Sequence, residues 1–201
     1  MTRYRPFVDD PVHIAQLLGQ RYVVLRVTGA LYESYRRVET EVRRRLQGLP
    51  VSYPAQPHVT LIGLDPTTSE AQVRDLVSDW ATDVAPLDLH AKRVSSFPSP
   101  FQIVVVEVLR TPALARALSS LRGEAKRRGL RDLARIAPED WTFHMSVAYC
   151  SGLASDEWTD VCRWAETIVP PDGQAIIAEV EMVTFDADGE LSLGRVALSK
   201  A

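Results

Sequence analysis

Two short segments of the chain place a histidine two residues before a hydroxyl residue. The first reads PHVTLI and contains His58 and Thr60; the second reads FHMSVA and contains His144 and Ser146. On a β-strand alternate side chains share a face, so each histidine and its hydroxyl residue would point the same way, roughly 7 Å apart. A polar face of this kind on an otherwise apolar strand is costly to bury unless it has a use.

A pair of histidines suits the cleavage of a phosphodiester. One ring takes a proton from the attacking oxygen and the other gives a proton to the leaving oxygen, and histidine titrates near neutrality. Neighbouring hydroxyl groups can hydrogen-bond the non-bridging phosphate oxygens. We therefore predict His58 and His144 as the catalytic pair and Thr60 and Ser146 as phosphate-binding residues. This chemistry needs no metal, and we expect no cofactor.

Other residues near the two segments are weaker candidates. Tyr149 and Phe97 are aromatic residues that could stack on a nucleobase, with a place in the core as the alternative reading of each. Strict alternation puts Tyr149 on the face opposite His144, and Cys150 on the face of His144. A nucleophilic thiol needs a lowered pKa and a positioned base, and we expect neither for Cys150. His90 has no hydroxyl residue two positions later, so we interpret it as non-catalytic.

The elements that would position these residues follow one order twice: strand, helix, strand, helix, strand. In the first half they are expected at residues 22–28, 33–46, 58–62, 70–80 and 87–94. In the second half they are expected at residues 101–109, 112–128, 142–149, 156–168 and 174–185, with a closing strand at 190–198 and a hairpin around Asp188-Gly189. We expect helix caps at Ser69, Thr111 and Ser155.

Corresponding features of the two halves recur at one spacing. His58 and His144 lie 86 residues apart, as do Ser69 and Ser155, which indicates an internal duplication. We predict an α+β fold with two pseudo-symmetric lobes around a central cleft, each a mainly antiparallel sheet flanked by helices. The chain would be a single domain over 1–201, with an N-terminal extension of about 1–20 and lobe units of about 21–97 and 101–198.

The amino-acid composition limits the kinds of partner that the chain is expected to bind. The chain has 201 residues, 46% of them hydrophobic and 24% charged, with a formal net charge of −3. A protein that coats long nucleic acid usually carries a basic surplus, so an RNA end or a small nucleotide is the better expectation. Two cysteines make no disulfide framework, and we find no secretion signal and no apolar run of membrane-spanning length. We expect a cytoplasmic monomer with no membrane partner.

The paired His-x-Thr/Ser segments in a duplicated layout resemble the two-histidine (2H) phosphoesterase superfamily. Within it the chain looks most like the bacterial 2'-5' RNA ligase / RNA 2',3'-cyclic phosphodiesterase group, from about Tyr22 to Leu198. The resemblance implies both histidines facing one cleft, no metal cofactor, and 2',3'-cyclic phosphate ends of RNA or nucleotides as substrates, with reversible 2'-5' ligation as a related activity. For hydrolysis of a cyclic phosphate we expect His144 to act as the base on water and His58 as the acid.

The stretch after the second segment departs from that group. Its members often carry a basic residue there, whereas this chain reads AYCS from Ala148 to Ser151. This departure bears on the substrate and not on the phosphoesterase chemistry. Two other functions also stay open. One is a non-catalytic module that binds nucleotides or RNA on the same fold. The other is a 2H enzyme for a different cyclic or 2'-5' linked nucleotide.

Overall fold

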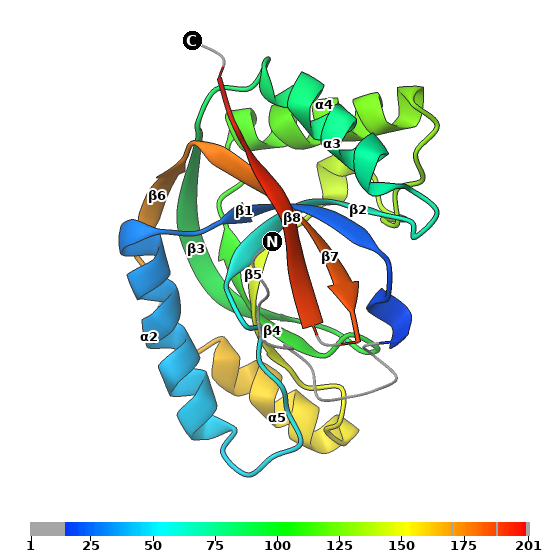
Figure 1. Cartoon of the computed structure of the whole chain (residues 1–201). Coiled ribbons are helices and arrows are strands. Elements are labelled where there is room, and N and C mark those ends of the chain that lie inside the picture. Colours follow the sequence, from blue (N-terminus) through cyan, green and yellow to red (C-terminus); the bar gives the residue numbers. More distant parts are fainter. Residues whose placement is uncertain (1–14, 170, 188, 200–201) are drawn as a thin grey trace.

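Two four-stranded antiparallel sheets and four main helices make up the computed structural model, which describes residues 15–169, 171–187 and 189–199 (Figure 1). We call the sheet with strand order β2-β1-β7-β8 the first lobe and the sheet with order β5-β4-β3-β6 the second lobe. In the first lobe the strands are β1 (Arg21–Arg26), β2 (His58–Leu64), β7 (Glu179–Asp186) and β8 (Gly189–Ala197). In the second lobe they are β3 (Leu87–Phe97), β4 (Ile103–Val108), β5 (His144–Tyr149) and β6 (Gln174–Ile177). This is the α+β, two-sheet fold that the sequence predicts.

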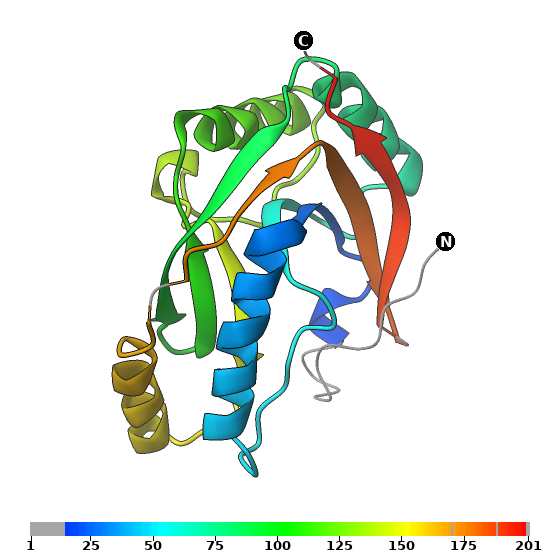
Figure 2. The same cartoon turned by 90° about the vertical axis from the view of Figure 1, so that its left-hand side faces the viewer.

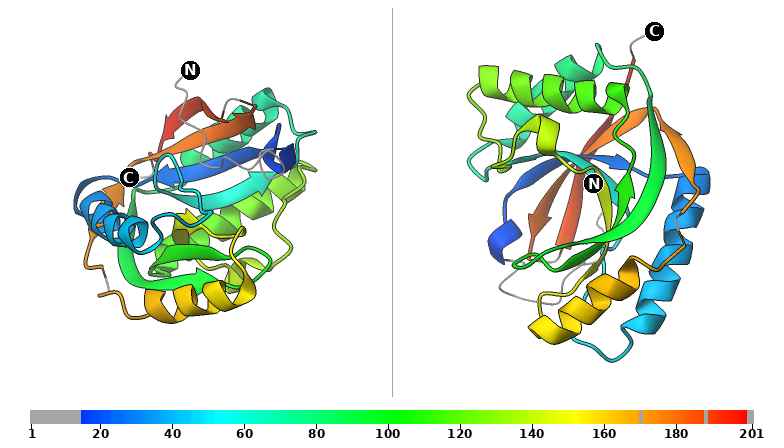
Figure 3. Two further views of the ribbon diagram at one scale, coloured as in Figure 1. Left: turned by 90° about the horizontal axis from the view of Figure 1, so that it is seen from below. Right: turned by 180° about the vertical axis from the view of Figure 1, so that it is seen from behind.

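Each sheet is covered by one helix from each half of the chain. Helices α3 (Glu70–Ala81) and α4 (Pro112–Arg127) pack together on the side of the first lobe, near the top of Figure 1. Helices α2 (Gly29–Arg45) and α5 (Ser155–Ala165) pack against strands of the second lobe, and the right-hand view of Figure 3 shows both in the lower part of the molecule. A 3-10 turn at Pro138–Asp140 precedes β5. Among the residues that the structure describes, no helix is long and apolar enough to cross a membrane.

The two sheets do not coincide with the two halves of the sequence. Strand β3, from the first half, pairs with β4, whereas the C-terminal hairpin β7–β8 pairs with β1. The single strand expected over 174–185 is two strands that separate at Ala178, because β6 pairs with β3 and β7 pairs with β1. Figure 2 shows the chain passing there from one sheet to the other. Each lobe therefore depends on strands from both ends of the chain.

The helix starts follow the predicted caps with one exception. Ser69 forms a reciprocal capping box with Gln72, and the Thr111 hydroxyl accepts a hydrogen bond from the Leu114 amide ahead of the first turn of α4. Ser155, expected to cap α5, is instead its first residue. The N-cap is Ala154, whose amide donates to Glu157. The 86-residue spacing of the two serines therefore does not extend to a shared capping role.

Two isolated bridges join the histidine strands of the two lobes. Ser52, in the loop before β2, exchanges backbone hydrogen bonds of 3.0 and 2.8 Å with Tyr149 at the end of β5. In the reverse direction Leu64, at the end of β2, bridges Asp132 in the loop before β5. The loop before each histidine strand therefore pairs with the last residue of the other histidine strand. This reciprocal pairing brings β2 and β5 together between the sheets.

Candidate active site

Both histidines are the first residue of an edge strand that carries the same β-bulge. Thr60 pairs with Val24 and the next pair is Ile62 with Val23, so Leu61 is left without a partner. In β5 the pairs pass in the same way from Ser146 to Ala148 and leave out Val147. Leu61 and Val147 each come three residues after their histidine. The bulge is therefore repeated at the same place in both lobes, which supports the predicted duplication.

The bulges separate the polar start of each strand from its apolar end. His58, Thr60, His144 and Ser146 are partly accessible, while the residues between and directly after them are fully buried in the core. The fully buried Val24 and Val105 lie beside the two hydroxyl residues on the neighbouring strands. Strands β2 and β5 contact each other, and His58 contributes to the lowered pKa of His144.

Both imidazoles are held by a backbone carbonyl two residues earlier in the chain. Nδ1 of His58 lies 3.2 Å from the carbonyl oxygen of Gln56, and Nδ1 of His144 lies 2.9 Å from that of Thr142. A carbonyl only accepts, so each of these contacts needs a proton on Nδ1 and leaves Nε2 of the neutral ring with its lone pair. At His58 the same Nδ1 also lies 3.3 Å from Nη1 of Arg26, which can only donate, so the two contacts need opposite tautomers of this ring. His144 therefore offers the lone pair of Nε2, whereas Nε2 of the neutral His58 carries the proton when the ring bonds Arg26 and the lone pair when it bonds Gln56.

Burial lowers the pKa of both histidines to about 4. For His58 the guanidinium of Arg26 lowers the pKa further, against the opposite effects of the Gln56 carbonyl and Glu181. For His144 the neighbouring His58 lowers the pKa, while the Thr142 carbonyl and Glu107 raise it. Both rings are therefore neutral near pH 7 when the site holds no anion.

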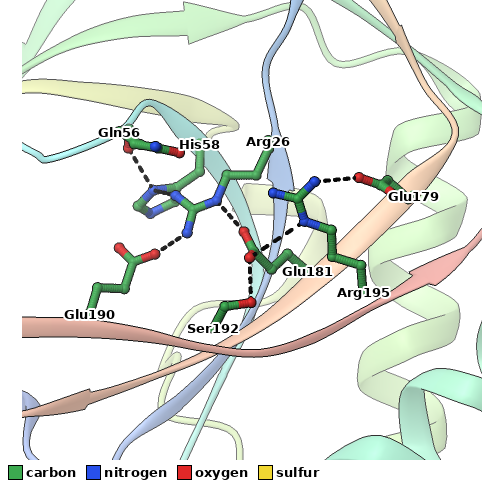
Figure 4. A network of polar contacts seen from close by, with 8 residues as sticks. All are labelled: Arg26, Gln56, His58, Glu179, Glu181, Glu190, Ser192 and Arg195. Atoms are coloured by element: carbon green, nitrogen blue, oxygen red, sulfur yellow. Dashed lines mark hydrogen bonds and ion pairs between the residues drawn. The ribbon is translucent and has the colours of Figure 1, made fainter. Parts of the chain in front are cut away.

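In the first lobe a buried network of ion pairs lies next to His58 (Figure 4). Arg26 is the cross-strand partner of His58, and its Nη1 lies 3.3 Å from the His58 Nδ1. The same guanidinium bonds Glu181 and Glu190, both of which have side chains only 2% exposed. Ser192 donates a further hydrogen bond to Glu181. Because removing one member would leave a buried charge without its partner, this network holds Arg26 in place.

In the second lobe the corresponding position carries the opposite charge. Glu107 is the cross-strand partner of His144, and its side chain is 9% exposed. Lys92 and Arg93 on β3 pair with this carboxylate at 3.1 and 2.8 Å. Burial opposes ionisation, but hydrogen bonds from Arg93, Ser95 and Lys92 lower the pKa of Glu107 to about 2. Glu107 is therefore an anion throughout the range in which histidine titrates.

The two aromatic candidates both lie at the site. The Phe97 ring packs edge-on against His144, with 4.7 Å between ring centroids. The prediction that Tyr149 faces away from His144 is wrong: because the bulge at Val147 shifts the alternation, Tyr149 turns toward Ser146 and pairs with its side chain. Gly63 holds the matching position in β2, where a Cβ atom would lie 2.8 Å from the ring of Tyr22.

The same bulge places Cys150 in the core. Strict alternation predicts Cys150 on the face of His144, but its side chain is fully buried and its sulfur contacts the Ala148 carbonyl at 3.9 Å. Burial raises the pKa of this thiol to about 12. The expectation that Cys150 is no nucleophile agrees with this environment.

Sequence reasoning missed Arg26 and Glu107. Their roles follow from cross-strand register, which a single sequence does not display. A signal was present nevertheless, because Glu107 interrupts the apolar strand IVVVEV and Arg26 ends the apolar strand RYVVLR. A charged residue within or directly after a buried strand usually has a partner, and here both flank a histidine.

Comparison with known proteins agrees with this arrangement. The fold matches TT0787 of Thermus thermophilus with a TM-score of 0.65 at 17% identity, over 90% of this chain and 98% of that one. It matches E. coli LigT complexed with 3'-AMP with a TM-score of 0.62 at 16% identity, over 90% and 99% of the two chains. For Usb1 of Kluyveromyces marxianus the TM-score is 0.53 at 9% identity, over 87% and 97%.

At the level of sequence, no curated protein matches the chain. The model of the 2'-5' RNA ligase superfamily, however, matches residues 33–189, which contain both histidine segments and both bulges. The similar solved structures include a further protein described as a phosphoesterase. The chain therefore belongs to the 2'-5' RNA ligase superfamily of 2H phosphoesterases.

Proposed function

We propose that the protein is a metal-independent phosphodiesterase that opens 2',3'-cyclic phosphates at RNA ends or on nucleotides. The observation that carries this proposal is the repeated strand. His58 with Thr60 and His144 with Ser146 start two strands with the same bulge, and the strands meet between the lobes. A phosphate held between them would have an imidazole Nε2 on each side and a hydroxyl donor from each strand.

The reaction needs only proton transfer and charge stabilisation. A water oxygen attacks phosphorus while one imidazole takes its proton, and the bond to a ribose oxygen breaks as the other imidazole protonates that oxygen. Thr60 and Ser146 hydrogen-bond the non-bridging oxygens, where negative charge gathers in the transition state. With a 5'-hydroxyl in place of water, the same proton transfers would break the bond between phosphorus and the 3'-oxygen and leave a 2'-5' phosphodiester, which is 2'-5' ligation.

The surroundings of the site favour a nucleotide over long RNA. A cavity of about 760 Å³ is lined by Phe97 and Thr142, both of which contact His144, although His144 itself does not line it. The cavity has room for a nucleoside beside an aromatic ring. The net charge of −3 gives the chain no basic surplus for binding a long polyanion. Structures of E. coli LigT complexed with 3'-AMP, with ATP and with NADP+ show that this fold accommodates nucleotides in that protein.

The test is turnover of nucleoside 2',3'-cyclic phosphates by the purified protein in the presence of a chelator. We expect wild type to be active and His58→Ala and His144→Ala each to lose about 10² to 10⁴ in rate. His90→Ala is the matched control, because His90 lies on β3 outside the two segments and should keep full activity. Tight nucleotide binding without turnover would instead identify a binding module, and loss of activity on chelation would contradict the metal-free mechanism.

A panel of related substrates separates this activity from those of other 2H enzymes. Cyclic dinucleotides and linear 2'-5' oligonucleotides require the same two imidazoles but a differently shaped subsite. We expect the 2',3'-cyclic phosphate to be the best substrate and Phe97→Ala to raise its KM more than it lowers kcat. A clear preference for a linear 2'-5' bond would move the proposal to that substrate class.

A further inference from the structure

The two hydroxyl residues of the site differ in how firmly their own side chains are fixed. Thr60 carries a methyl group on Cβ, which restricts its χ1 rotation, whereas the hydroxyl of the unbranched Ser146 can rotate among the staggered positions. Both residues hold the same place, two positions after a histidine and directly before the bulge. The serine therefore needs another contact to fix its hydroxyl as well as the threonine is fixed.

Tyr149 makes such a contact. Because of the bulge at Val147, its side chain turns toward Ser146 and is hydrogen-bonded to the Ser146 side chain. The backbone of Tyr149 is held in turn by Ser52, through hydrogen bonds of 2.8 and 3.0 Å. Burial raises the pKa of the Tyr149 phenol to about 12, so this hydroxyl keeps its proton throughout the range in which histidine titrates.

We propose that Tyr149 is a positioning residue of the phosphate site: its phenol donates to the Ser146 hydroxyl and so directs the Ser146 proton toward a bound phosphate. The proposal rests on the phosphodiesterase function proposed above. A serine hydroxyl has a single proton to donate, but its oxygen can also accept. When the phenol bonds that oxygen, the Ser146 proton is left for a non-bridging oxygen of the phosphate. A donor that is fixed before the substrate binds has no ordering cost to meet at the moment of reaction.

The backbone of Ser146 is fixed by a second tyrosine. Tyr35 on α2 is only 1% exposed, and its hydroxyl donates a hydrogen bond of 2.9 Å to the Ser146 carbonyl oxygen. The ladder between strands is locally disrupted at a bulge, so this bond gives the carbonyl a donor from outside the sheet. Ser146 is therefore held twice, at its carbonyl by Tyr35 and at its side chain by Tyr149.

The first lobe uses its tyrosine differently. Gly63 holds the position in β2 that matches Tyr149, and Tyr22 lies directly across from it on β1. The Tyr22 ring approaches Gly63 closely, but its hydroxyl donates to the side chain of Gln20. A tyrosine thus lies near this place in both lobes, and the lobe that carries a serine is the one in which it bonds the hydroxyl residue.

The test is a set of double variants, read by opening of a nucleoside 2',3'-cyclic phosphate and by binding of inorganic phosphate. Tyr149→Phe alone should lower kcat/KM about fivefold, because it removes one hydrogen bond at the site. In a Ser146→Ala background the same change should cost less than about twofold, and in a Thr60→Ala background again about fivefold. Tyr32→Phe is the matched control, because Tyr32 lies exposed on α2, and it should leave activity unchanged.

A threonine in place of the serine should make Tyr149 less important. In Ser146→Thr the added methyl group restricts χ1 as it does in Thr60, so Tyr149→Phe should then cost less than about twofold. A purely structural role of Tyr149 predicts the same loss in every background, because the fold depends on the tyrosine whatever residue stands at this position.

An undiminished loss in either the Ser146→Ala or the Ser146→Thr background would overturn the proposal. Tyr149 would then contact the phosphate directly or support the fold alone. If wild type opens no cyclic phosphate but binds inorganic phosphate with the expected coupling between Ser146 and Tyr149, the proposed function fails and the positioning role stands. Normal turnover without this coupling contradicts the positioning role alone.

Discussion

The two lobes share the same backbone arrangement around their histidines but place charges of opposite sign beside them. Both present a histidine at the start of an edge strand, a hydroxyl residue two positions later and a bulge directly after it. Beside His58 lies an arginine held by buried carboxylates, and beside His144 lies a carboxylate held by half-exposed cations. The comparison shows that two lobes can repeat the backbone around a histidine while the neighbouring strands place charges of opposite sign beside it.

Removing both histidines is the strongest way to test whether the lobes act as one site. Because groups that act in a single step are non-additive, His58→Ala/His144→Ala should lose little more than the worse single variant, about 10² to 10⁴. Steady-state rates with a cyclic nucleotide measure this. If the rate loss of the double variant equals the product of the two single losses, the two rings contribute independently. The two lobes would then not act as one site.

The low pKa values of the two histidines predict a shared effect on stability. Both folded-state values lie near 4, below the ordinary value of 6.5, so the unfolded chain binds more protons between these pH values. The free energy of unfolding should therefore fall as pH drops from about 6.5 to 4, by about 1.4 kcal/mol per pH unit for each ring that fully changes its protonation.

Urea unfolding at several pH values measures this dependence. His58→Gln/His144→Gln should flatten the slope in that window, and His90→Gln should leave it unchanged. A double variant with the wild-type slope would show that the two rings are not buried as neutral groups. A different loss for each single variant would show which lobe shields its ring better.

The smallest expected difference lies at the helix that follows each histidine strand. Ser69 caps α3 through Gln72, whereas Ser155 makes no capping bond on α5. Ser69→Ala should therefore lower the free energy of unfolding by about 1 kcal/mol, and Ser155→Ala by less than about 0.5 kcal/mol. Thermal unfolding of both variants is sufficient. Equal losses of unfolding free energy in the two variants would indicate that Ser155 also caps its helix, which would contradict the difference between the lobes.

The sequence predicted the parts of the site that depend on local pattern. The His-x-hydroxyl segments, their strands, the cap at Ser69 and the two-sheet fold follow from residue order and periodicity. It did not predict the side of the strand on which Tyr149 and Cys150 lie, because one extra residue at Val147 shifts the alternation. A bulge is decided by pairing with β4 and leaves no mark in the periodicity of β5 alone.

The other features that the sequence did not predict depend on which strands pair with each other in the folded protein. The division of residues 174–185 between two sheets depends on which strands β6 and β7 meet, and both segments read alike as strand. Arg26 and Glu107 acquire their roles only through cross-strand register with the histidines. The duplication of about 21–97 and 101–198 stays a prediction. The repeated bulge supports it, while the exchange of strands between lobes shows that such units would not fold separately.

A structure with inorganic phosphate bound tests the central claim that the two lobes form one phosphate site. We expect one phosphate between the lobes, with Nε2 of both histidines at hydrogen-bond distance and the hydroxyls of Thr60 and Ser146 on its remaining oxygens. A phosphate held by one lobe alone, or imidazoles too far apart to contact the same phosphate, would contradict the account.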